Sequence, residues 1–310
     1  MQATRYILVI IIFGSIASLG FGQSLQGTIE THSFIGAITG STVLYNIYLP
    51  VGYDTTTTRY PVIYHLGGLG DTPSGHNTTI CETFEFAQDS GAIGPVIIVF
   101  PNSYGYTFWA DSIDSTKPAE TNVIQELIPH IDSTYRTLAQ QQYRIVQGWS
   151  MGGFGAALYF VKYPTLFNAA VLYDAALFPW STMTTELPDT TQAIFGNNEA
   201  YFNQYSPWVY AANNASLLQQ STSIRMVVAA LTTYNRDYRD YLNSLTIYPV
   251  YVETTSVHIV ATVFAAEGYN SAGFIANRFN AFSSPTTVDR HWQLYSYNKL
   301  TTENTKNKSF

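Results

Sequence analysis

The chain has 310 residues, of which 46% are hydrophobic and only 11% are charged, and its formal net charge is −7. This length allows one large α/β domain or two smaller ones, with ample apolar content for a core. The negative charge, with only 14 Lys plus Arg, argues against nucleic acid or an anionic membrane surface as a partner. The single cysteine, Cys81, excludes an intrachain disulfide, and we expect it to be a buried small hydrophobe.

The N-terminal segment predicts export. An apolar run from Tyr6 to Phe13 follows a basic residue and gives way to small residues. These are the three regions of a secretory signal peptide, so we expect residues 1–22 to be cleaved and the mature protein to be secreted or periplasmic. The alternative is an uncleaved membrane anchor, although a run of about 16 residues is short for a span. Residues 23–300 are predicted to form one domain, followed by a polar tail at 301–310.

Strand-like and helix-like segments alternate along the mature chain. The predicted strands are 43–49, 60–66, 95–100, 143–147, 169–173, 224–230 and 248–253. The predicted helices are 120–135, a segment after Gly153, 237–245, 260–266 and 272–282. Pro129 predicts a kink or an early stop in the first of these helices. The alternation predicts an α/β fold with a doubly wound, mostly parallel sheet, and the strand at 95–100, apolar on both faces, belongs in its middle.

One long insertion interrupts this alternation. Residues 178–223 follow the strand that ends at Asp174, and they are crowded with aromatic side chains. Two interpretations stay open. The insertion is either a packed surface subdomain or a lid over the carboxyl edge of the sheet, where open α/β folds bind their ligands.

The segment from Tyr143 to Pro164 carries the strongest chemical signal. A β-branched run leads into Gly148-Trp149-Ser150-Met151-Gly152, which has the form G-x-S-x-G, and an apolar helical period follows. Strand, sharp turn and helix are the context of a nucleophile elbow, which exposes the serine hydroxyl. The Met151 amide, at the start of the helix, is then free to donate a hydrogen bond to an oxyanion.

The sequence resembles the esterase branch of the α/β-hydrolases, which includes esterase D, feruloyl and acetylxylan esterases and the mycolyltransferases. The matching segments are YNIYLPVGYDTTTTRYPVIYHLGGLGD (45–71), IQELIPHIDSTYR (124–136) and GWSMGGFGAALYFVKYPTLFNAAVLY (148–173), with looser matches at 235–245 and 251–258. The resemblance implies an α/β-hydrolase fold with Ser150 as nucleophile and His258 as general base. It also implies that the amides of Met151 and Leu69 form the oxyanion hole.

The chain departs from the family pattern in two places. Gly67 occupies the position where the family usually has His or Asp after the second of these strands. The family acid normally follows the strand at 224–230, but the turn there carries no carboxylate. Asp174 ends the neighbouring strand at the same edge of the sheet and is our first candidate, since such an acid would orient the histidine. Asp237, Asp240 or the absence of any acid stay open as alternatives.

These features predict a secreted serine carboxylesterase that works through an acyl-enzyme. Trp109, Trp149 and Trp180 would suit an aromatic acyl group or a sugar face, so a feruloyl or acetyl ester, free or attached to polysaccharide, is the expected substrate. No metal or organic cofactor is expected, because no ligand spacing for one occurs. An acyltransferase, a catalytically degenerate binding protein and a membrane-held interaction protein are the alternatives.

Overall fold

The computed structural model describes residues 25–219 and 223–281. Within these residues, eight strands form one sheet in the order β1-β2-β4-β3-β5-β6-β7-β8. The strands are β1 (Thr28–Ile35), β2 (Thr42–Leu49), β3 (Val62–Leu66), β4 (Ile97–Pro101), β5 (Arg144–Trp149), β6 (Ala169–Tyr173), β7 (Ile224–Val228) and β8 (Val250–Glu253). β1, β2 and β4 pair antiparallel, and every pairing from β4 across to β8 is parallel. The predicted α/β class with a mostly parallel sheet is confirmed.

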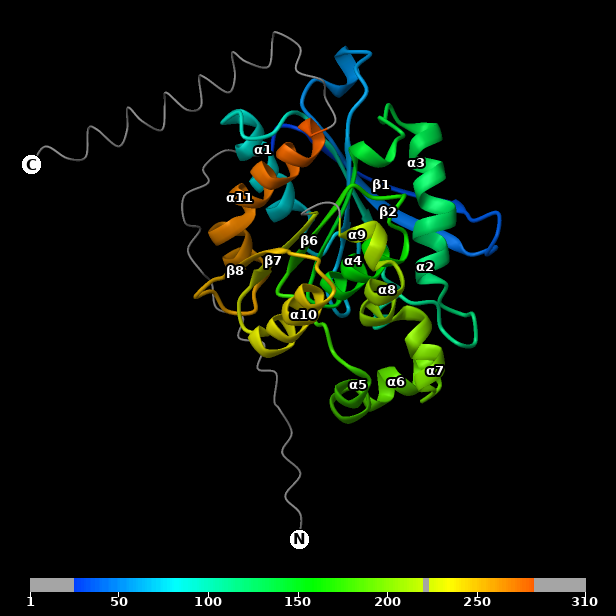
Figure 1. The fold of residues 1–310 in the computed structure, drawn as a ribbon. Coiled ribbons are helices and arrows are strands. Elements are labelled where there is room, and N and C mark those ends of the chain that lie inside the picture. Colours follow the sequence, from blue (N-terminus) through cyan, green and yellow to red (C-terminus); the bar gives the residue numbers. More distant parts are fainter. Residues whose placement is uncertain (1–24, 220–222, 282–310) are drawn as a thin grey trace, which may run out of the picture.

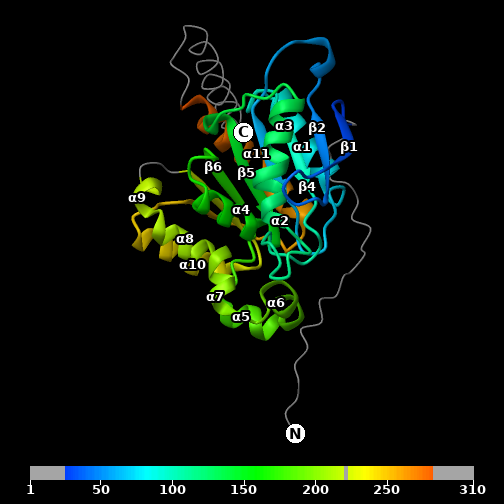
Figure 2. The same ribbon diagram turned by 90° about the vertical axis from the view of Figure 1, so that its right-hand side faces the viewer.

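Helices cover both faces of the sheet. In Figure 1, α1 and α11 lie on one side of the sheet, and α2 and α3 lie on the other; Figure 2 shows α2, α3 and α4 in front of the strands. The longer helices are α1 (Asn77–Asp89), α3 (Ile128–Thr134), α4 (Met151–Lys162), α10 (Thr232–Ser244) and α11 (Val260–Asn280). The segment before α3 consists of α2 (Ala119–Thr121) and the π-helical stretch η2 (Asn122–Leu127), and two short 3-10 turns are η1 (Tyr53–Thr55) and η3 (Gln141–Tyr143).

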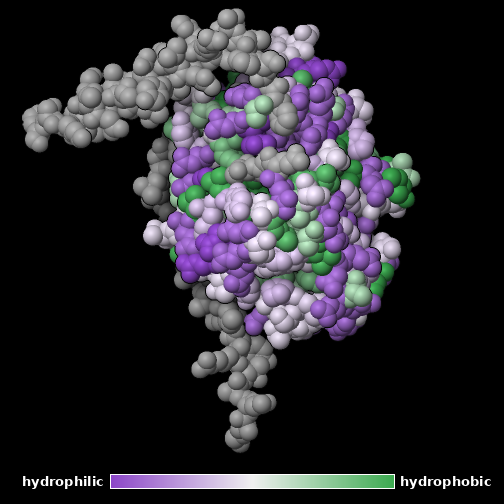
Figure 3. Space-filling model, in the orientation of Figure 1, coloured by the Kyte–Doolittle hydropathy of each residue, from purple (hydrophilic) through white to green (hydrophobic). Residues whose placement is uncertain are grey.

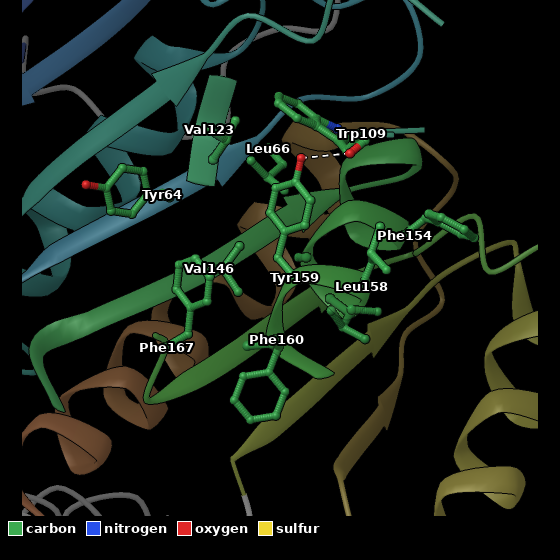
Figure 4. Packing of buried hydrophobic residues seen from close by; sticks show 14 of the residues in the cluster. Tyr64, Leu66, Trp109, Val123, Val146, Phe154, Leu158, Tyr159, Phe160 and Phe167 are labelled. Atoms are coloured by element: carbon green, nitrogen blue, oxygen red, sulfur yellow. Dashed lines mark hydrogen bonds between the residues drawn. The ribbon is translucent and has the colours of Figure 1, made fainter. Parts of the chain in front are cut away.

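Two apolar cores therefore lie on opposite faces of the sheet. The larger core includes side chains of α4 such as Phe154, Leu158 and Tyr159, and Figure 4 shows them together with Leu66 of β3 and Val146 of β5. The smaller core lies beneath α1 and α11 and contains Cys81, whose side chain is fully buried as expected. Burial also raises the pKa of the Cys81 thiol well above its usual value, which keeps it protonated and unreactive.

The central strands are buried on both faces, which is why their sequences read as continuous apolar runs. All residues of β3, β4, β5, β6 and β7 are buried. Parallel strands in a doubly covered sheet need this pattern, since neither face meets water. Such strands are easily predicted from sequence, and each of these five overlaps a predicted one.

The helix that precedes β5 departs from expectation. It does not stop at Pro129 but continues to Thr134, and its irregular part, η2, lies just before the proline. Proline has no N–H and its ring clashes with the carbonyl four residues earlier, so a regular helical turn cannot precede it. The wider π-helical turns of η2 accommodate this change in spacing. The two short helices predicted near the C-terminus are in fact one continuous helix, α11.

The insertion folds into short helices. They are α5 (Trp180–Glu186), α6 (Pro188–Phe195), α7 (Glu199–Phe202), η4 (Asn203–Tyr205), α8 (Pro207–Asn213) and α9 (Ala215–Leu218). Figures 1 and 2 show α5, α6 and α7 projecting beyond the end of the sheet at which the chain leaves β6. Phe195 and Phe202 are buried in the larger core, and the Asn214 side chain donates to the Val161 carbonyl of α4 at 2.8 Å. The insertion is thus packed onto the domain through its aromatic residues.

The predicted signal peptide, residues 1–22, and the polar tail, 301–310, lie outside the described residues. Among the residues that are described, no helix is both long and apolar enough to cross a bilayer. Figure 3 shows hydrophilic and hydrophobic residues interspersed on the visible face.

Candidate active site

Ser150 lies in the turn between β5 and α4, and its backbone is strained. Its φ of 55° and ψ of −117° are unusual for a residue with a side chain. The glycines of the motif permit this turn. A Cβ at Gly148 would lie 2.0 Å from the Gly152 carbonyl oxygen, and one at Gly152 would lie 1.9 Å from that of Leu66. The sequence G-x-S-x-G therefore builds the nucleophile elbow that it predicts.

The structure brings Ser150, His258 and Asp174 together from three separate loops. His258 Nε2 lies 3.0 Å from Ser150 Oγ, and His258 Nδ1 lies 2.5 Å from Asp174 Oδ2. His258 follows β8, and its imidazole stacks on the Trp149 ring with centroids 4.3 Å apart. Serine, imidazole and carboxylate in this order form the chain of contacts that nucleophilic catalysis by serine requires.

Asp174 is fully buried and held by backbone amides of the turn after β7. The amides of Ala229, Ala230 and Leu231 donate to its carboxylate at 2.9, 3.1 and 2.9 Å. Burial by itself would raise the pKa of Asp174, but the hydrogen bonds from His258 and from these amides outweigh it and hold the pKa below its usual value. Asp174 is therefore ionised at neutral pH and able to stabilise an imidazolium.

The other two candidate acids lie elsewhere. Asp237 and Asp240 are on α10 with exposed side chains, and Asp240 pairs with Arg239 at 2.8 Å. Neither contacts His258. They are ordinary solvated charges of a surface helix.

The two amides predicted to form an oxyanion hole remain available. Met151 is the first residue of α4, where amides have no acceptor within the helix. Leu69 follows β3 in the neighbouring loop. Within the described residues, the Leu69 amide donates no hydrogen bond. Both amides follow the carboxyl end of a strand, β5 for Met151 and β3 for Leu69, at the edge of the sheet that also carries Ser150.

The three tryptophans predicted to contact substrate do not share one role. Trp109 is 0% exposed, and its indole donates to the Gly67 carbonyl at 3.1 Å, so its predicted contact with substrate is wrong. The Trp149 ring stacks on the His258 imidazole. Trp180 packs against Phe202 within the insertion, with ring centroids 5.4 Å apart. The sequence could not separate the roles of the three tryptophans, because an indole ring suits a core as well as a binding surface.

Comparison with known proteins adds an independent finding. A family model described as "Putative esterase" matches residues 36–240. The chain belongs to this family. The match includes the elbow and Asp174 but ends before His258. This esterase family consists of serine hydrolases with an α/β-hydrolase fold, as the resemblance in the sequence implied.

Two curated relatives share part of this esterase sequence. An esterase of Mycobacterium tuberculosis is 37% identical over 131 residues, which make up 40% of this chain and 27% of that protein. An endo-1,4-beta-xylanase/feruloyl esterase of Xylanibacter ruminicola is 32% identical over 156 residues, or 46% of this chain and 21% of the relative. The aligned part is thus about a quarter of the length of these larger proteins.

Solved structures extend the likeness to about four fifths of this chain. A ferulic acid esterase superposes with a TM-score of 0.71 at 20% identity, covering 82% of this chain and 99% of that structure. An S-formylglutathione hydrolase from Agrobacterium tumefaciens gives a TM-score of 0.69 at 15% identity, covering 83% and 97%. At such low identity these neighbours establish the fold and nothing about the substrate.

Proposed function

We propose that this chain is a secreted serine carboxylesterase that forms an acyl-enzyme on Ser150. The observation that carries the proposal is the continuous contact from Ser150 through His258 to Asp174, at 3.0 and 2.5 Å. The absent family acid had favoured a degenerate binding protein. Asp174, from the neighbouring strand, supplies a carboxylate to the histidine and so favours an enzyme over a degenerate binding protein.

In the proposed mechanism, Ser150 Oγ attacks the ester carbonyl while His258 Nε2 takes its proton. The negative charge that develops on the carbonyl oxygen is stabilised by the amides of Met151 and Leu69. Asp174 holds Nδ1 protonated and stabilises the imidazolium. The imidazolium then protonates the leaving alcohol, and a water activated by the same histidine releases the carboxylic acid and regenerates Ser150.

The substrate that we propose is a feruloyl or acetyl ester, either free or attached to polysaccharide. Support comes from the feruloyl esterase relative, which is 32% identical to this chain over 156 residues. Apolar side chains beside the site also favour an aromatic acyl group. Leu69 and Tyr106 are 40% and 53% exposed, and the Tyr106 hydroxyl lies beside Gly70. Val257 and Ile259, which flank the histidine, are exposed as well.

The test is hydrolysis of p-nitrophenyl acetate and methyl ferulate by the protein and by its Ser150→Ala variant. We expect turnover by the parent and a loss of at least about a thousandfold in the variant, since no other nucleophile occupies the elbow. A folded parent without activity on any short ester would contradict the proposal.

Addition of an acceptor alcohol distinguishes an acyltransferase, which would form a new ester. The intact mass of the exported protein tests whether residues 1–22 are removed.

A further inference from the structure

The peptide group between Gly67 and Gly68 has both of its polar atoms bound by side chains. Its carbonyl oxygen accepts from Trp109 Nε1 at 3.1 Å, and its N–H donates to Asp71 Oδ2 at 2.6 Å. This peptide lies one position before the Leu69 amide, the second proposed oxyanion donor. Two side chains from different loops thus grip the backbone directly beside the proposed oxyanion hole.

The next peptide group is held at one end only. The Gly68 carbonyl accepts from the Asp71 amide at 3.2 Å. The N–H of the same peptide belongs to Leu69 and has no acceptor among the residues that the structure describes. In a trans peptide the C=O and N–H point in opposite directions. The Asp71 contact with this carbonyl therefore also fixes the direction of the Leu69 N–H.

The loop requires such support because glycine leaves its backbone soft. Side chains are excluded at both positions. A Cβ at Gly67 would lie 2.9 Å from Asp71 Cβ, and one at Gly68 would lie 2.9 Å from Trp149 Cδ1. The glycines let the side chains of Asp71 and Trp149 approach the backbone closely. The two hydrogen bonds from this backbone to Asp71 and Trp109, which we call the clamp, restore the rigidity that the glycines remove.

Both clamping residues are themselves fixed. The Asp71 carbonyl accepts from Ser103 Oγ at 2.9 Å, and Asp71 Oδ1 lies 3.4 Å from His76 Nε2. Burial by itself would raise the pKa of Asp71, but the hydrogen bonds from His76 and Gly68 outweigh it and hold the pKa below its usual value. The carboxylate is therefore ionised at neutral pH, and a charged acceptor makes the stronger hydrogen bond.

Trp109 is held equally firmly under α4. Its carbonyl accepts from the Tyr159 hydroxyl at 2.7 Å, as Figure 4 shows, and its amide donates to Thr107 Oγ1 at 3.2 Å. The indole fits against Gly155, where a Cβ would lie 2.5 Å from Trp109 Cγ. The ring is completely buried, so its contribution to the site passes through the Gly67 carbonyl.

We propose that Asp71 and Trp109 are positioning residues that lock the loop after β3 and aim the Leu69 amide at the oxyanion. This inference rests on the proposed esterase function. Its consequence is that both side chains act on the transition state, in which the oxyanion exists, and hardly on the binding of the substrate.

The test compares Trp109→Phe and Asp71→Ala with matched controls. We expect kcat to fall about 10- to 100-fold in both variants with KM within twofold of the parent, because a donor displaced by a fraction of an ångström loses most of its effect. The inhibition constant of phenylboronic acid, whose serine adduct carries an anionic oxygen, should rise in proportion. Asp71→Asn keeps an oxygen acceptor for the Gly68 amide and should retain most activity.

Two control variants remove the same chemical groups away from the site. Trp208→Phe deletes a buried indole N–H that has no partner among the described residues, and Asp114→Ala deletes an exposed carboxylate that accepts from the Thr116 amide at 3.1 Å. Both should keep the parent's kcat. Thermal midpoints show which variants are folded, and Trp109→Phe, which retains a large ring, decides the matter if Asp71→Ala is unstable.

Two failures can be told apart. A parent that is inactive, or whose activity survives Ser150→Ala, removes the esterase proposal and with it the oxyanion hole. An active parent that needs Ser150, together with folded Trp109→Phe and Asp71→Ala variants that keep full kcat and full boronate affinity, overturns the clamp alone. Equal changes in kcat for Trp109→Phe and Trp208→Phe would also overturn it.

Discussion

At the level of single residues, the site has its carboxylate on a different strand from the one that the family pattern predicts. The turn after β7 carries no carboxylate, but its backbone amides bind one. The amides of Ala229, Ala230 and Leu231 bind Asp174, which extends from β6. These amides help to offset the desolvation of a fully buried carboxylate. The turn that carries the acid in the family pattern here binds a carboxylate that the neighbouring strand supplies.

Asp174→Asn should lower kcat by roughly 10³- to 10⁴-fold with the fold retained. An asparagine oxygen still accepts from the amides of Ala229 and Leu231, but its amide group facing His258 favours the wrong imidazole tautomer. The measurement is ester turnover, with circular dichroism to verify folding. Asp237→Asn and Asp240→Asn are matched controls on the exposed face of α10 and should stay within about twofold of the parent. Parent-like kinetics in Asp174→Asn would remove its assignment as the acid.

The sequence predicts this site unevenly. Ser150 follows from local pattern alone, because strand, glycines and helix are all adjacent in the chain. Asp174 could only be weighed against alternatives, since its partners lie 55 to 84 positions away. The structure places the Asp174 carboxylate against His258 through a contact that no local window contains. The signal for Asp71 was present in the motif LGGLGD, but its role depends on the backbone conformation of the loop.

At the scale of elements, the β1–β2 hairpin shows how distant segments are joined. Its connecting loop is bound by Glu126 of η2, which accepts from the amides of Ala37 and Thr39 at 3.0 Å each and also from that of Ile38. β1 is the antiparallel edge strand, and all of its residues are partly or fully exposed. The sequence analysis did not predict β1, because its sequence is largely polar. An edge strand needs no apolar pattern when the neighbouring strand supplies the hydrogen bonds.

Glu126→Ala should lower the free energy of unfolding by about 2 kcal/mol, because three loop amides lose a charged acceptor. Chemical denaturation of the parent and the variant measures this difference. Glu126→Gln keeps one acceptor oxygen and should fall between them. Esterase activity should not change in either variant, because β4 and β3 separate the hairpin from β5, the strand that leads to Ser150. A variant as stable as the parent would show that water replaces the carboxylate at no cost.

At the scale of the whole molecule, the covered sheet encloses a titratable side chain. His65 is at the end of β3, only 3% exposed, and its Nδ1 lies 3.2 Å from Gln147 Nε2. The rings of Phe100 and Phe264, both in the smaller core, lie with their centroids 5.6 and 6.0 Å from that of His65. Desolvation lowers the pKa of His65 to about 3, partly opposed by the charge of Asp71 and assisted by that of His76. His65 is therefore a buried histidine whose Nδ1 is satisfied by Gln147.

This burial makes the stability of the molecule depend on pH. The folded pKa of His65 is about 3, below the value of about 6.5 for an exposed histidine. Below pH 6.5 His65 is protonated in the unfolded chain but stays neutral in the folded chain. The free energy of unfolding therefore falls as the pH decreases toward 3. The slope from this residue is about 1.4 kcal/mol per pH unit, or about 2 kcal/mol between pH 6.5 and 5.

His65→Gln removes the titrating group and keeps a polar side chain beside Gln147. We expect the variant to be less stable than the parent at pH 7, through lost packing, but to lose less stability on acidification. The difference between the two free energies of unfolding should therefore shrink by about 2 kcal/mol from pH 6.5 to 5. Urea denaturation at both pH values measures it, and other titrating groups cancel in the comparison. Parallel pH profiles would mean that His65 takes up its proton in the folded state, through water that reaches the core between β3 and α11.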